Sequence, residues 1–563
     1  MDIKLEIAKI LEKQDIGMET EEILKTLETP PNKDMGDYAF PCFRLAKTLR
    51  KAPNLIAEDL ASKISSDFLA KVVNLGPYIN FYVNYEMMAK NTIEAILEQK
   101  DDFGRKKIGQ GQNVIIEYSS TNIAKPFHIG HIRSTVQGDA LKRIFDFLGY
   151  NTIAINYLGD HGTQFGILLA AYELWGDKEA IDKNPINELL KLYVRYNDMV
   201  EEDADKMQAA RDWFRRLEAD DPEALKVWNW FKEISLKEFQ RVYEMLDIEF
   251  DSYDGEHYHS KFVPEIIDLF KSKNLLEESD EAQIVDLGED MPPAIILKRD
   301  ASSTYITRDV ATAIKRKEKY DFYKNIYVVA TQQNLHFKQL KKLIDKLGYT
   351  WSDEIEHVAF GMVSLADGTL STRKGQVVFL EDVLNKSVQK TLDIIEKRNP
   401  NLENKEKVAS EIGIGAIKFQ ELFNNRIKDY VFDWDEVLNF DGETGPYVQY
   451  THARANSLVN KYGKEISSDV DYSILSTDEE KDLIMNLYKA PEVIVQAMDK
   501  LEASLITRHL VEIAKSFNKF YNNTRIIDSS EEEQKARIAL VKSSQIVIKN
   551  LLGLLGIKAP ERM

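Results

Sequence analysis

The sequence predicts a multidomain α/β protein, and three observations predict that class. The 563 residues, of which 44% are hydrophobic and 30% charged, are enough for three or four packed domains. In the middle of the chain, short apolar strands alternate with amphipathic helices, a pattern typical of a doubly wound parallel sheet. After about residue 385 the strand patterns fade and helical patterns continue, which indicates a helical bundle.

The predicted domains follow one another along the chain. Residues 1–105 combine helical patterns with a β-rich piece at 76–83, which predicts a small α+β domain that ends in a charged linker. Residues 106–388 form the predicted α/β domain, with a helical insertion at about 175–260, and residues 389–563 form the bundle. Strands are expected at 114–116, 152–155, 326–330 and 357–363, and bundle helices at 411–423, 448–462, 479–498 and 501–521.

The composition limits the compartment and the partners. Cys42 is the single cysteine, so an internal disulfide and a thiolate zinc site are excluded, and no tightly bound metal is expected. No window reaches the roughly 20 apolar residues that span a bilayer, and the N-terminus lacks the layout of a signal peptide. We therefore expect a cytoplasmic protein without a membrane partner. The net charge of -19 argues against nucleic acid, but basic stretches at 315–317 and 338–346 leave an RNA partner open.

A polar loop with two histidines lies between the first strand of the α/β domain and a long helix. The loop reads TNIAKPFHIGH (residues 121–131), and the apolar stripe of the helix recurs every four residues from Ile132 to Leu148. A strand-to-helix loop of this kind offers unpaired backbone N–H groups to an anion, and Gly130 would let a nucleotide approach closely. His128 and His131 could donate hydrogen bonds to phosphate as charge develops. The alternatives are a metal-binding pair or polar residues satisfied within the core, although the spacing of zinc-hydrolase motifs is absent.

A second basic cluster contains Ser371, Thr372, Arg373, Lys374 and Gly375. Small hydroxyl groups, two cations and a glycine are suited to a mobile clamp on phosphate. The cluster does not match the Walker A pattern, and on its own it could be an ordinary solvated loop.

The two clusters together resemble the paired signatures of class I aminoacyl-tRNA synthetases, and the resemblance narrows to the arginyl family. The segments that carry it are GDYAF (36–40), GPYINF (76–81), EYSSTNIAKP (117–126), NYLGD (156–160), GTQFG (162–166), YITRD (305–309), QQNLHF (332–337), TGPYVQYTHAR (444–454) and ERM (561–563). The resemblance implies a Rossmann-like class I catalytic domain, an N-terminal α+β tRNA-binding domain and a C-terminal α-helical anticodon-binding bundle. It implies ATP-dependent ligation of L-arginine to tRNA(Arg) through an arginyl-adenylate, with release of AMP and pyrophosphate.

The resemblance also assigns the ATP site. The residues it implies to contact ATP, which would arrive with Mg²⁺, are Gly130, His128, His131, Ser371, Thr372, Arg373 and Lys374. The implied catalytic residues are His128, His131, Lys125 and Lys374. Thr372 occupies the place of the second signature lysine, and in this family a lysine just before the histidine loop, here Lys125, is thought to substitute.

The implied L-arginine pocket consists of Glu117, Asn122, Tyr305, Asp309 and Gln333. The carboxylates would serve the α-amino and guanidinium groups, because a planar guanidinium is best matched by a bidentate carboxylate. Without the surrounding motifs, Tyr305 would be interpreted as a core aromatic, Glu117 as a strand-end charge and Asp309 as the cap of the following helix.

For tRNA, the resemblance implies contacts from Asn80, Tyr447, Tyr450, Arg454 and Met563. Aromatic side chains can stack on unpaired bases, although Tyr447 and Tyr450 could instead pack between domains. The expected partners are therefore tRNA(Arg), L-arginine and ATP, and the protein is expected to be a monomer. The habit of the family further predicts that adenylate formation needs bound tRNA.

The sequence departs from the family at two positions. His161 stands where the family usually has tryptophan, which puts the packing around the substrate pocket in doubt. Leu370 replaces a methionine, and the expected effect of this change is small.

The rival functions are those of a cysteinyl or valyl synthetase, an RNA-binding adaptor without catalysis and a small nucleotidylyltransferase. The absence of zinc-ligand cysteines and of a long editing insertion weighs against a cysteinyl or valyl synthetase. The intact histidines and Lys374 weigh against the adaptor, and the chain length and C-terminal bundle weigh against the nucleotidylyltransferase.

Overall fold

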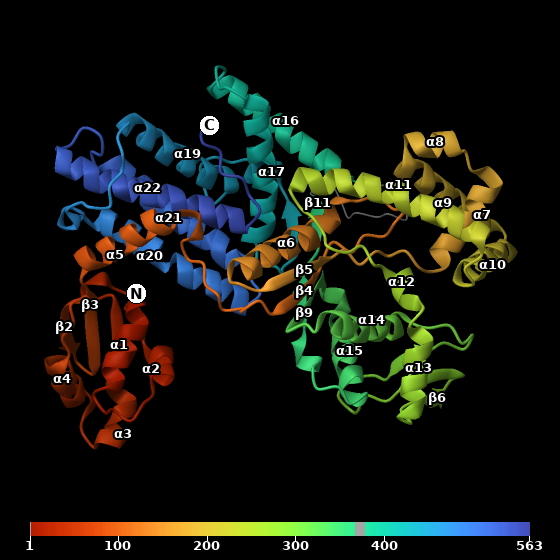
Figure 1. Cartoon of the computed structure of the whole chain (residues 1–563), viewed down its shortest axis with the longest axis horizontal. Helices are drawn as coiled ribbons and strands as arrows, with labels where there is room; N and C mark the ends of the chain where they lie inside the picture. The colour runs from red at the N-terminus through yellow and green to blue at the C-terminus, as the bar shows by residue number, and fades with distance from the viewer. Residues whose placement is uncertain (1, 366–377) are drawn as a thin grey trace. The chain divides into compact units, whose positions relative to one another are not determined.

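The computed structural model describes residues 2–365 and 378–563 of the chain (Figure 1). Their contacts divide the protein into two compact units. The first unit consists of Met1–Phe103, Arg454–Ala490 and Glu512–Ile548, and the second of Gly104–Ala453, Pro491–Val511 and Lys549–Met563. The C-terminal helices therefore contribute residues to both units.

A three-stranded antiparallel sheet forms the N-terminal part of the first unit. The strand order is β1 (Tyr38–Pro41), β3 (Tyr78–Val83) and β2 (Leu69–Leu75). The helices of this part are α1 (Ile3–Glu12), α2 (Thr20–Thr26), α3 (Leu45–Leu49), α4 (Pro53–Lys63) and α5 (Tyr85–Gln99). The Asp2 side chain caps α1, which buries Ile3, Ile7 and Leu11 at helical spacing. The predicted α+β architecture is confirmed.

The second unit is built on a four-stranded parallel sheet. The strand order is β10 (Ile355–Phe360), β9 (Lys324–Ala330), β4 (Asn113–Glu117) and β5 (Asn151–Ile155). The chain passes from β4 through α6 (Ile132–Phe147) to β5 at one edge, and it then returns across β4 to β9. The strand order thus reverses between β4 and β9, and in open α/β sheets the crevice at the carboxyl ends of the strands beside such a reversal is where ligands bind. The predicted Rossmann-like topology is confirmed.

Helices α14 (Tyr305–Tyr320) and α15 (Asn334–Lys346) share one hydrophobic core with this sheet. Val310 and Ile314 of α14 and Leu340 of α15 are buried there together with Ile115 of β4. Their spacing of three or four residues gives each helix one apolar face. This packing fixes the start of α14 near the carboxyl edge of the sheet.

The predicted strand at 357–363 is wrong in its second half. β10 ends at Phe360, and Val363–Leu365 form a separate strand, β11, which pairs in parallel with β12 (Tyr430–Phe432). At the break the backbone passes very close to another segment, because a Cβ on Gly361 would lie 2.6 Å from the carbonyl oxygen of Ile427. The Gly361 N–H donates to the carbonyl of Arg426 at 2.7 Å. The chain therefore leaves the main sheet at the one residue that allows this approach.

The connection from β5 to β9 contains the expected helices. They are α7 (Thr163–Trp175), α8 (Lys178–Lys183), α9 (Pro185–Glu202), α10 (Met207–Glu218), α11 (Pro222–Leu246), α12 (Glu256–Ser260) and α13 (Val263–Ser272). A small antiparallel sheet of β6 (Glu277–Ser279), β7 (Ala282–Val285) and β8 (Ala294–Leu297) follows them and was not predicted. Its strands have three or four residues, too few for an alternating pattern to stand out.

The C-terminal part is helical, as predicted. Its helices are α16 (Leu380–Arg398), α17 (Lys405–Phe423), α18 (Trp434–Val437), α19 (Gly445–Tyr462), α20 (Asp478–Asp499), α21 (Ser504–Asn523) and α22 (Glu531–Leu554). The prediction missed α16 and α22 as well as the short strand β12. No helix among the described residues is long and apolar enough to cross a membrane.

Candidate active site

The loop that follows β4 is held in shape by neighbouring side chains. Ser119 and Ala124 adopt left-handed backbone conformations, with φ of 67° and 58°. The Ser119 N–H donates to Oγ of Ser134 at 3.0 Å, and the Ala124 N–H donates to Oγ of Ser235 at 2.9 Å. Because a non-glycine residue in this region of backbone space is strained, the two hydrogen bonds stabilise a path that the loop would not adopt alone.

The two histidines stand in a short turn, η4 (Ile129–His131), at the start of α6. The Gly130 N–H donates to Nδ1 of His128 at 3.1 Å, and the His128 N–H donates to Nδ1 of His131 at 3.2 Å. Because Nδ1 of His128 accepts a backbone hydrogen bond, the proton of this neutral ring is on Nε2. Nδ1 of His131 also lies 3.2 Å from the carbonyl oxygen of His128, so this ring can accept from the His128 N–H or donate to the His128 carbonyl, depending on its tautomer. The ring centroids are 4.0 Å apart, so the loop places the two imidazole rings side by side.

Both histidines are neutral near pH 7. Burial lowers the pKa of His131 to about 3, and the charges of His128 and Lys125 add to this effect. Burial also lowers the pKa of His128. Neutral imidazole N–H groups at a helix N-terminus are suited to phosphate oxygens, since they donate hydrogen bonds without changing protonation. Among the described residues, no three metal-ligating side chains are grouped to hold a metal ion.

Ser371, Thr372, Arg373 and Lys374, together with Leu370, lie outside the described residues. The chain directly after them is attached to the histidine loop. The Ile129 N–H donates to the carbonyl of Val378 at 3.2 Å, and the Leu380 N–H donates to the carbonyl of Phe127 at 2.9 Å. Residues 378–380 therefore lie beside the histidine loop, although they are far from it in the sequence.

Glu117, the last residue of β4, is buried and paired with an internal arginine. Its Oε2 lies 2.7 Å from Nη1 of Arg316 in α14. The Arg316 guanidinium lies 5.3 Å from the ring centroid of Tyr157 and 5.6 Å from that of Tyr327. Burial raises the pKa of Glu117, and the charge of Arg316 opposes the rise. Glu117 is therefore no solvated strand-end charge, and its carboxylate has a permanent cation beside it.

Tyr305 and Asp309 lie about one turn apart at the start of α14. Tyr305 is 63% exposed, so the core-aromatic interpretation is wrong. The helix begins at Tyr305 with Thr304 as its N-cap, so Asp309 lies within the helix and the capping interpretation is wrong too. The carboxylate of Asp309 instead accepts from His336 of α15, with 2.6 Å between Oδ2 and Nε2.

Gln333 and Asn122 complete the predicted arginine pocket. Gln333 is exposed and ends the turn η6 (Thr331–Gln333) directly after β9. Asn122 follows β4, and its Oδ1 would lie 2.2 Å from a Cβ on Gly159, so the two backbones meet closely. Because β4 and β9 are parallel neighbours, Glu117, Asn122 and Gln333 all lie at the same edge of the sheet.

Glu256 of α12 belongs to the same region, and the sequence interpretation missed it. Its Oε2 lies 3.4 Å from Nε of Arg308. Burial raises the pKa of Glu256 to about 8, Arg308 opposes the rise, and the charge of Asp309 adds to it. The charge of Glu256 also raises the pKa of Tyr305, after burial as the main cause. No periodicity or motif marks Glu256, so only the fold could place it there.

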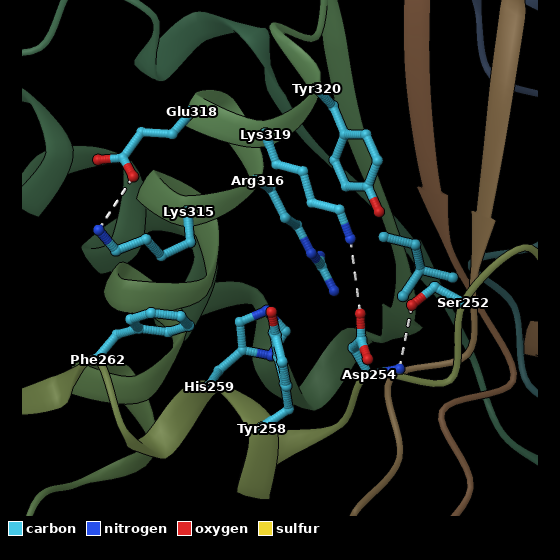
Figure 2. Close-up of a pocket in the computed structure, with 11 residues that line it drawn as sticks. Ser252, Asp254, Tyr258, His259, Phe262, Lys315, Arg316, Glu318, Lys319 and Tyr320 are labelled. Atoms are coloured by element: carbon cyan, nitrogen blue, oxygen red, sulfur yellow. Dashed lines mark hydrogen bonds and ion pairs between the residues drawn. The ribbon is translucent and has the colours of Figure 1, made fainter.

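A separate cavity of about 280 Å³ lies between α12 and the C-terminal half of α14 (Figure 2). It shares Arg316 with the crevice, but none of the predicted arginine-site residues lines it. Lys319 pairs with Asp254 at 3.8 Å, and Lys315 pairs with Glu318 at 3.0 Å (Figure 2). Each of these two lysines has a carboxylate partner, so neither offers an unmatched charge that would select a ligand.

The residues predicted to contact tRNA differ in their burial and in their contacts. Asn80 is buried in β3, and its side-chain amide donates to the carbonyl of Met35. Tyr447, Tyr450 and Arg454 all belong to α19, and Tyr450 is 40% exposed. Arg454 donates to Oδ1 of Asn518 and lies over the ring of Tyr521 at 4.7 Å. Met563 packs against an apolar cluster around Ile412. Of the five side chains, Tyr450 is the most open to solvent, whereas Asn80 is enclosed.

His161 packs against the helical insertion. It is 6% exposed, and its ring lies 5.1 Å from that of Phe214 in α10 in an edge-on arrangement. Its Nε2 lies 3.5 Å from Oε1 of Glu218 in the same helix. The departure from tryptophan is therefore accommodated by local packing with α10.

The parallel sheet with its switch point, the two histidine donors and the neighbouring carboxylates define a class I aminoacyl-tRNA synthetase. Family models agree, because residues 92–434 match the model described as tRNA synthetases class I (R), catalytic domain. Residues 1–83 match the arginyl tRNA synthetase N-terminal domain, and residues 448–563 match the DALR anticodon binding domain.

The chain belongs to the arginyl-tRNA synthetase family. It is 52% identical to an arginine–tRNA ligase of Halothermothrix orenii and 51% identical to one of Clostridioides difficile, in each case over 100% of both chains. The fold is similar to that of a solved arginyl-tRNA synthetase from Thermus thermophilus. The TM-score is 0.83 at 24% identity, over 99% of this chain and 98% of the other.

Proposed function

We propose that the protein attaches L-arginine to tRNA(Arg) in two steps at the crevice between β4 and β9. The arginine carboxylate attacks the α-phosphate of ATP, pyrophosphate leaves, and arginyl-adenylate forms. The 2′-hydroxyl of the terminal tRNA adenosine then takes the arginyl group and AMP is released. The observation that carries this proposal is the pair of neutral imidazole rings of His128 and His131, 4.0 Å apart at the start of the helix that follows β4 and its last residue, Glu117.

In the first step, ATP is bound as its Mg²⁺ complex. His128 and His131 donate hydrogen bonds to the phosphate oxygens, and Gly130 lets the nucleotide approach the start of α6. Lys125, whose charge already acts on His131, meets the charge that develops at the α-phosphate. Ser371, Thr372, Arg373 and Lys374 contact the phosphates from the second loop. Most of the rate acceleration comes from positioning and charge stabilisation, because the protein forms no covalent bond.

Arginine is bound by residues from three segments of the crevice edge. Glu117 ends β4 and Asn122 follows it, Tyr305 and Asp309 lie in the first two turns of α14, and Gln333 follows β9. Arg316 and His336 hold two of these carboxylates in fixed positions before the substrate arrives. Preformed acceptors of this kind favour the planar guanidinium over the ammonium of lysine, which cannot satisfy two acceptors in the same geometry.

Two regions of the chain bind tRNA in this proposal. Residues 1–105 do so through Asn80, and residues 389–563 through Tyr447, Tyr450, Arg454 and Met563. Tyr450 has the exposure that stacking on a base requires. The enclosed Asn80 would act through the loop of Met35 to which it donates. The protein works as a monomer in the cytoplasm.

The proposal is tested by arginine-dependent exchange of pyrophosphate into ATP, measured with tRNA present. We expect exchange with arginine and none with lysine. Robust tRNA binding without exchange would instead support the RNA-binding adaptor that has lost catalysis.

A further inference from the structure

A second buried arginine, Arg133, follows the histidine loop by two residues and joins it to a distant part of the chain. Its side chain is fully buried in the first turn of α6. Nη1 donates to the carbonyl oxygens of Gly361 at 2.9 Å and Lys428 at 2.8 Å, and Nη2 lies 3.5 Å from the carbonyl oxygen of Asn425. One guanidinium therefore binds three backbone carbonyls from two segments that are far apart in the sequence.

A carboxylate and an aromatic ring complete the surroundings of Arg133. Its Nε lies 3.3 Å from Oε2 of Glu421 in α17, whose side chain is 1% exposed. The guanidinium lies 5.2 Å from the ring centroid of Tyr430, and the Tyr430 hydroxyl donates to Oε1 of Glu421. Glu421, the ring of Tyr430 and three carbonyls surround the guanidinium and hold it in one position, with Nε facing Glu421 as an ion pair.

The carbonyls that Arg133 binds belong to two segments, one that leads into β11 and one that leads into β12. Gly361 is the break between β10 and β11, and residues 424–432 form the segment that contains β12. The two are joined independently of Arg133. The Met362 N–H donates to Oδ1 of Asp429 at 2.6 Å, the Tyr430 N–H donates to the carbonyl of Met362 at 3.1 Å, and β11 pairs with β12. β11 is thus attached to residues 424–432 and not to the main sheet.

Arg133 consequently joins this assembly to the first turn of α6, which begins directly after His131. Residues 378–380 attach to the histidine loop through backbone hydrogen bonds, whereas Arg133 is the side chain that binds Gly361 and Lys428 to the start of α6. A small shift between two groups that act on one substrate costs much of the rate, because the reacting geometry must be met within a fraction of an ångström.

We propose that Arg133 is a positioning residue that holds the first turn of α6, and with it His128 and His131, against Gly361 and residues 424–432, so that the two histidines meet the phosphates in one fixed position. The inference rests on the proposed function. Arg133 touches no substrate and acts through the backbone carbonyls that it binds.

The test compares Arg133→Lys and Tyr430→Phe with Arg143→Lys as a matched control. Arg143 lies in the same helix, and its Nε is 2.8 Å from Oδ2 of the buried Asp139, but it binds nothing near β11. Each full-length variant is assayed for arginine-dependent pyrophosphate exchange with tRNA present. The assay gives kcat, KM for arginine and KM for ATP, and the melting temperature of each variant is measured separately.

Lysine keeps the charge of Arg133 but cannot bind three carbonyls at once. We expect kcat of Arg133→Lys to fall at least about tenfold with KM for arginine changed less than about threefold, as expected for lost alignment. Tyr430→Phe should give a smaller fall in the same direction, and Arg143→Lys should keep the wild-type kcat. The positioning role would be overturned if Arg133→Lys and Tyr430→Phe both kept the kcat of the control. It would also be overturned if kcat fell in all three variants, the control included, and each fall only followed the loss of melting temperature. Absence of exchange in the wild type would overturn the proposed function and not this role.

If Arg133→Lys fails to fold, Tyr430→Phe decides the matter, because it removes only one hydroxyl. A lower kcat at wild-type melting temperature then supports the positioning role, and an unchanged kcat contradicts it.

Discussion

Nε2 of His336 lies 2.6 Å from Oδ2 of Asp309, and this contact orients the carboxylate at the start of α14. Asp309 occupies the second turn of the helix, so capping no longer explains the residue. The carboxylate is 25% exposed and can therefore meet a substrate while His336 holds it. Asp309 therefore has the fixed and accessible carboxylate that the proposed role as acceptor for the guanidinium of arginine requires.

Replacing Asp309 by Asn should lower kcat/KM for arginine by at least about a hundredfold, which is the scale of breaking a buried charge pair. The amide keeps the size but turns N–H groups toward the donors of the guanidinium. Glu318→Gln, at the exposed end of the same helix, is the control and should leave the constants unchanged. Wild-type arginine kinetics in Asp309→Asn would mean that the guanidinium binds elsewhere.

Replacing His128 or His131 by Ala should chiefly lower kcat, by about a hundredfold for each, since one donor aimed at developing charge contributes roughly 3 kcal/mol. The steady-state constants for arginylation check this. His131→Asn retains a side-chain N–H donor and should keep more activity than His131→Ala. Near-normal turnover in both alanine variants would remove the histidines from phosphate binding.

The neutral state of His131 predicts how stability depends on pH. The pKa of His131 is about 3 in the folded protein because burial disfavours the charged ring, whereas an unfolded histidine titrates near 6.5. Below pH 6.5 His131 binds a proton in the unfolded chain but not in the folded protein, so the free energy of unfolding falls as the pH falls toward 3. At pH 5 this one group costs about 2 kcal/mol. Melting temperatures of wild type and His131→Asn should therefore converge between pH 7.5 and 5. Parallel curves would show that His131 is not buried as a neutral ring.

Tyr450→Ala should weaken tRNA arginylation through KM for tRNA, because loss of stacking on one base costs about 1–3 kcal/mol. Tyr450→Phe keeps the ring and serves as the control. Arginine-dependent exchange at saturating tRNA should be the same in both variants. Removal of the whole region after about residue 395 would be a poorer test, since it also deletes β12 and Glu421, which lie beside β11 and Arg133. Unchanged KM for tRNA in Tyr450→Ala would indicate that this ring stacks on no base.

Adenylate formation should need bound tRNA. Pyrophosphate exchange with arginine and ATP alone should be far slower than exchange with tRNA(Arg) added, and a tRNA for another amino acid should not restore it. Equal rates with and without tRNA would contradict this dependence.

The parts of the fold that the sequence predicted have strong local signals. Three apolar runs became β4, β5 and β9, and the helix after the histidine loop buries its predicted stripe. The parts that it missed depend on contacts between distant segments. β10 ends where Gly361 meets residues 426–427, and β12 has three residues that acquire strand structure only through β11.

The same distinction applies to the candidate site. Motifs selected Glu117 and Asp309, but no local pattern reveals that Arg316 and His336 are their partners. Arg316 is part of an ordinary basic stretch in the sequence, and its burial between two tyrosine rings follows from the packing of α14 on the sheet. Burial and pairing of such groups are tertiary properties, so spacing alone could not predict them.

Aminoacylation of bulk tRNA with each of the twenty amino acids in turn tests the central claim most directly. The measurement needs only the purified protein, ATP with Mg²⁺ and one labelled amino acid at a time. We expect stable charging with arginine and with no other amino acid, lysine included, because the fixed acceptors at Asp309 and Glu117 match a planar guanidinium. Charging with a different amino acid, or with none while the protein is folded and binds tRNA, would contradict the account.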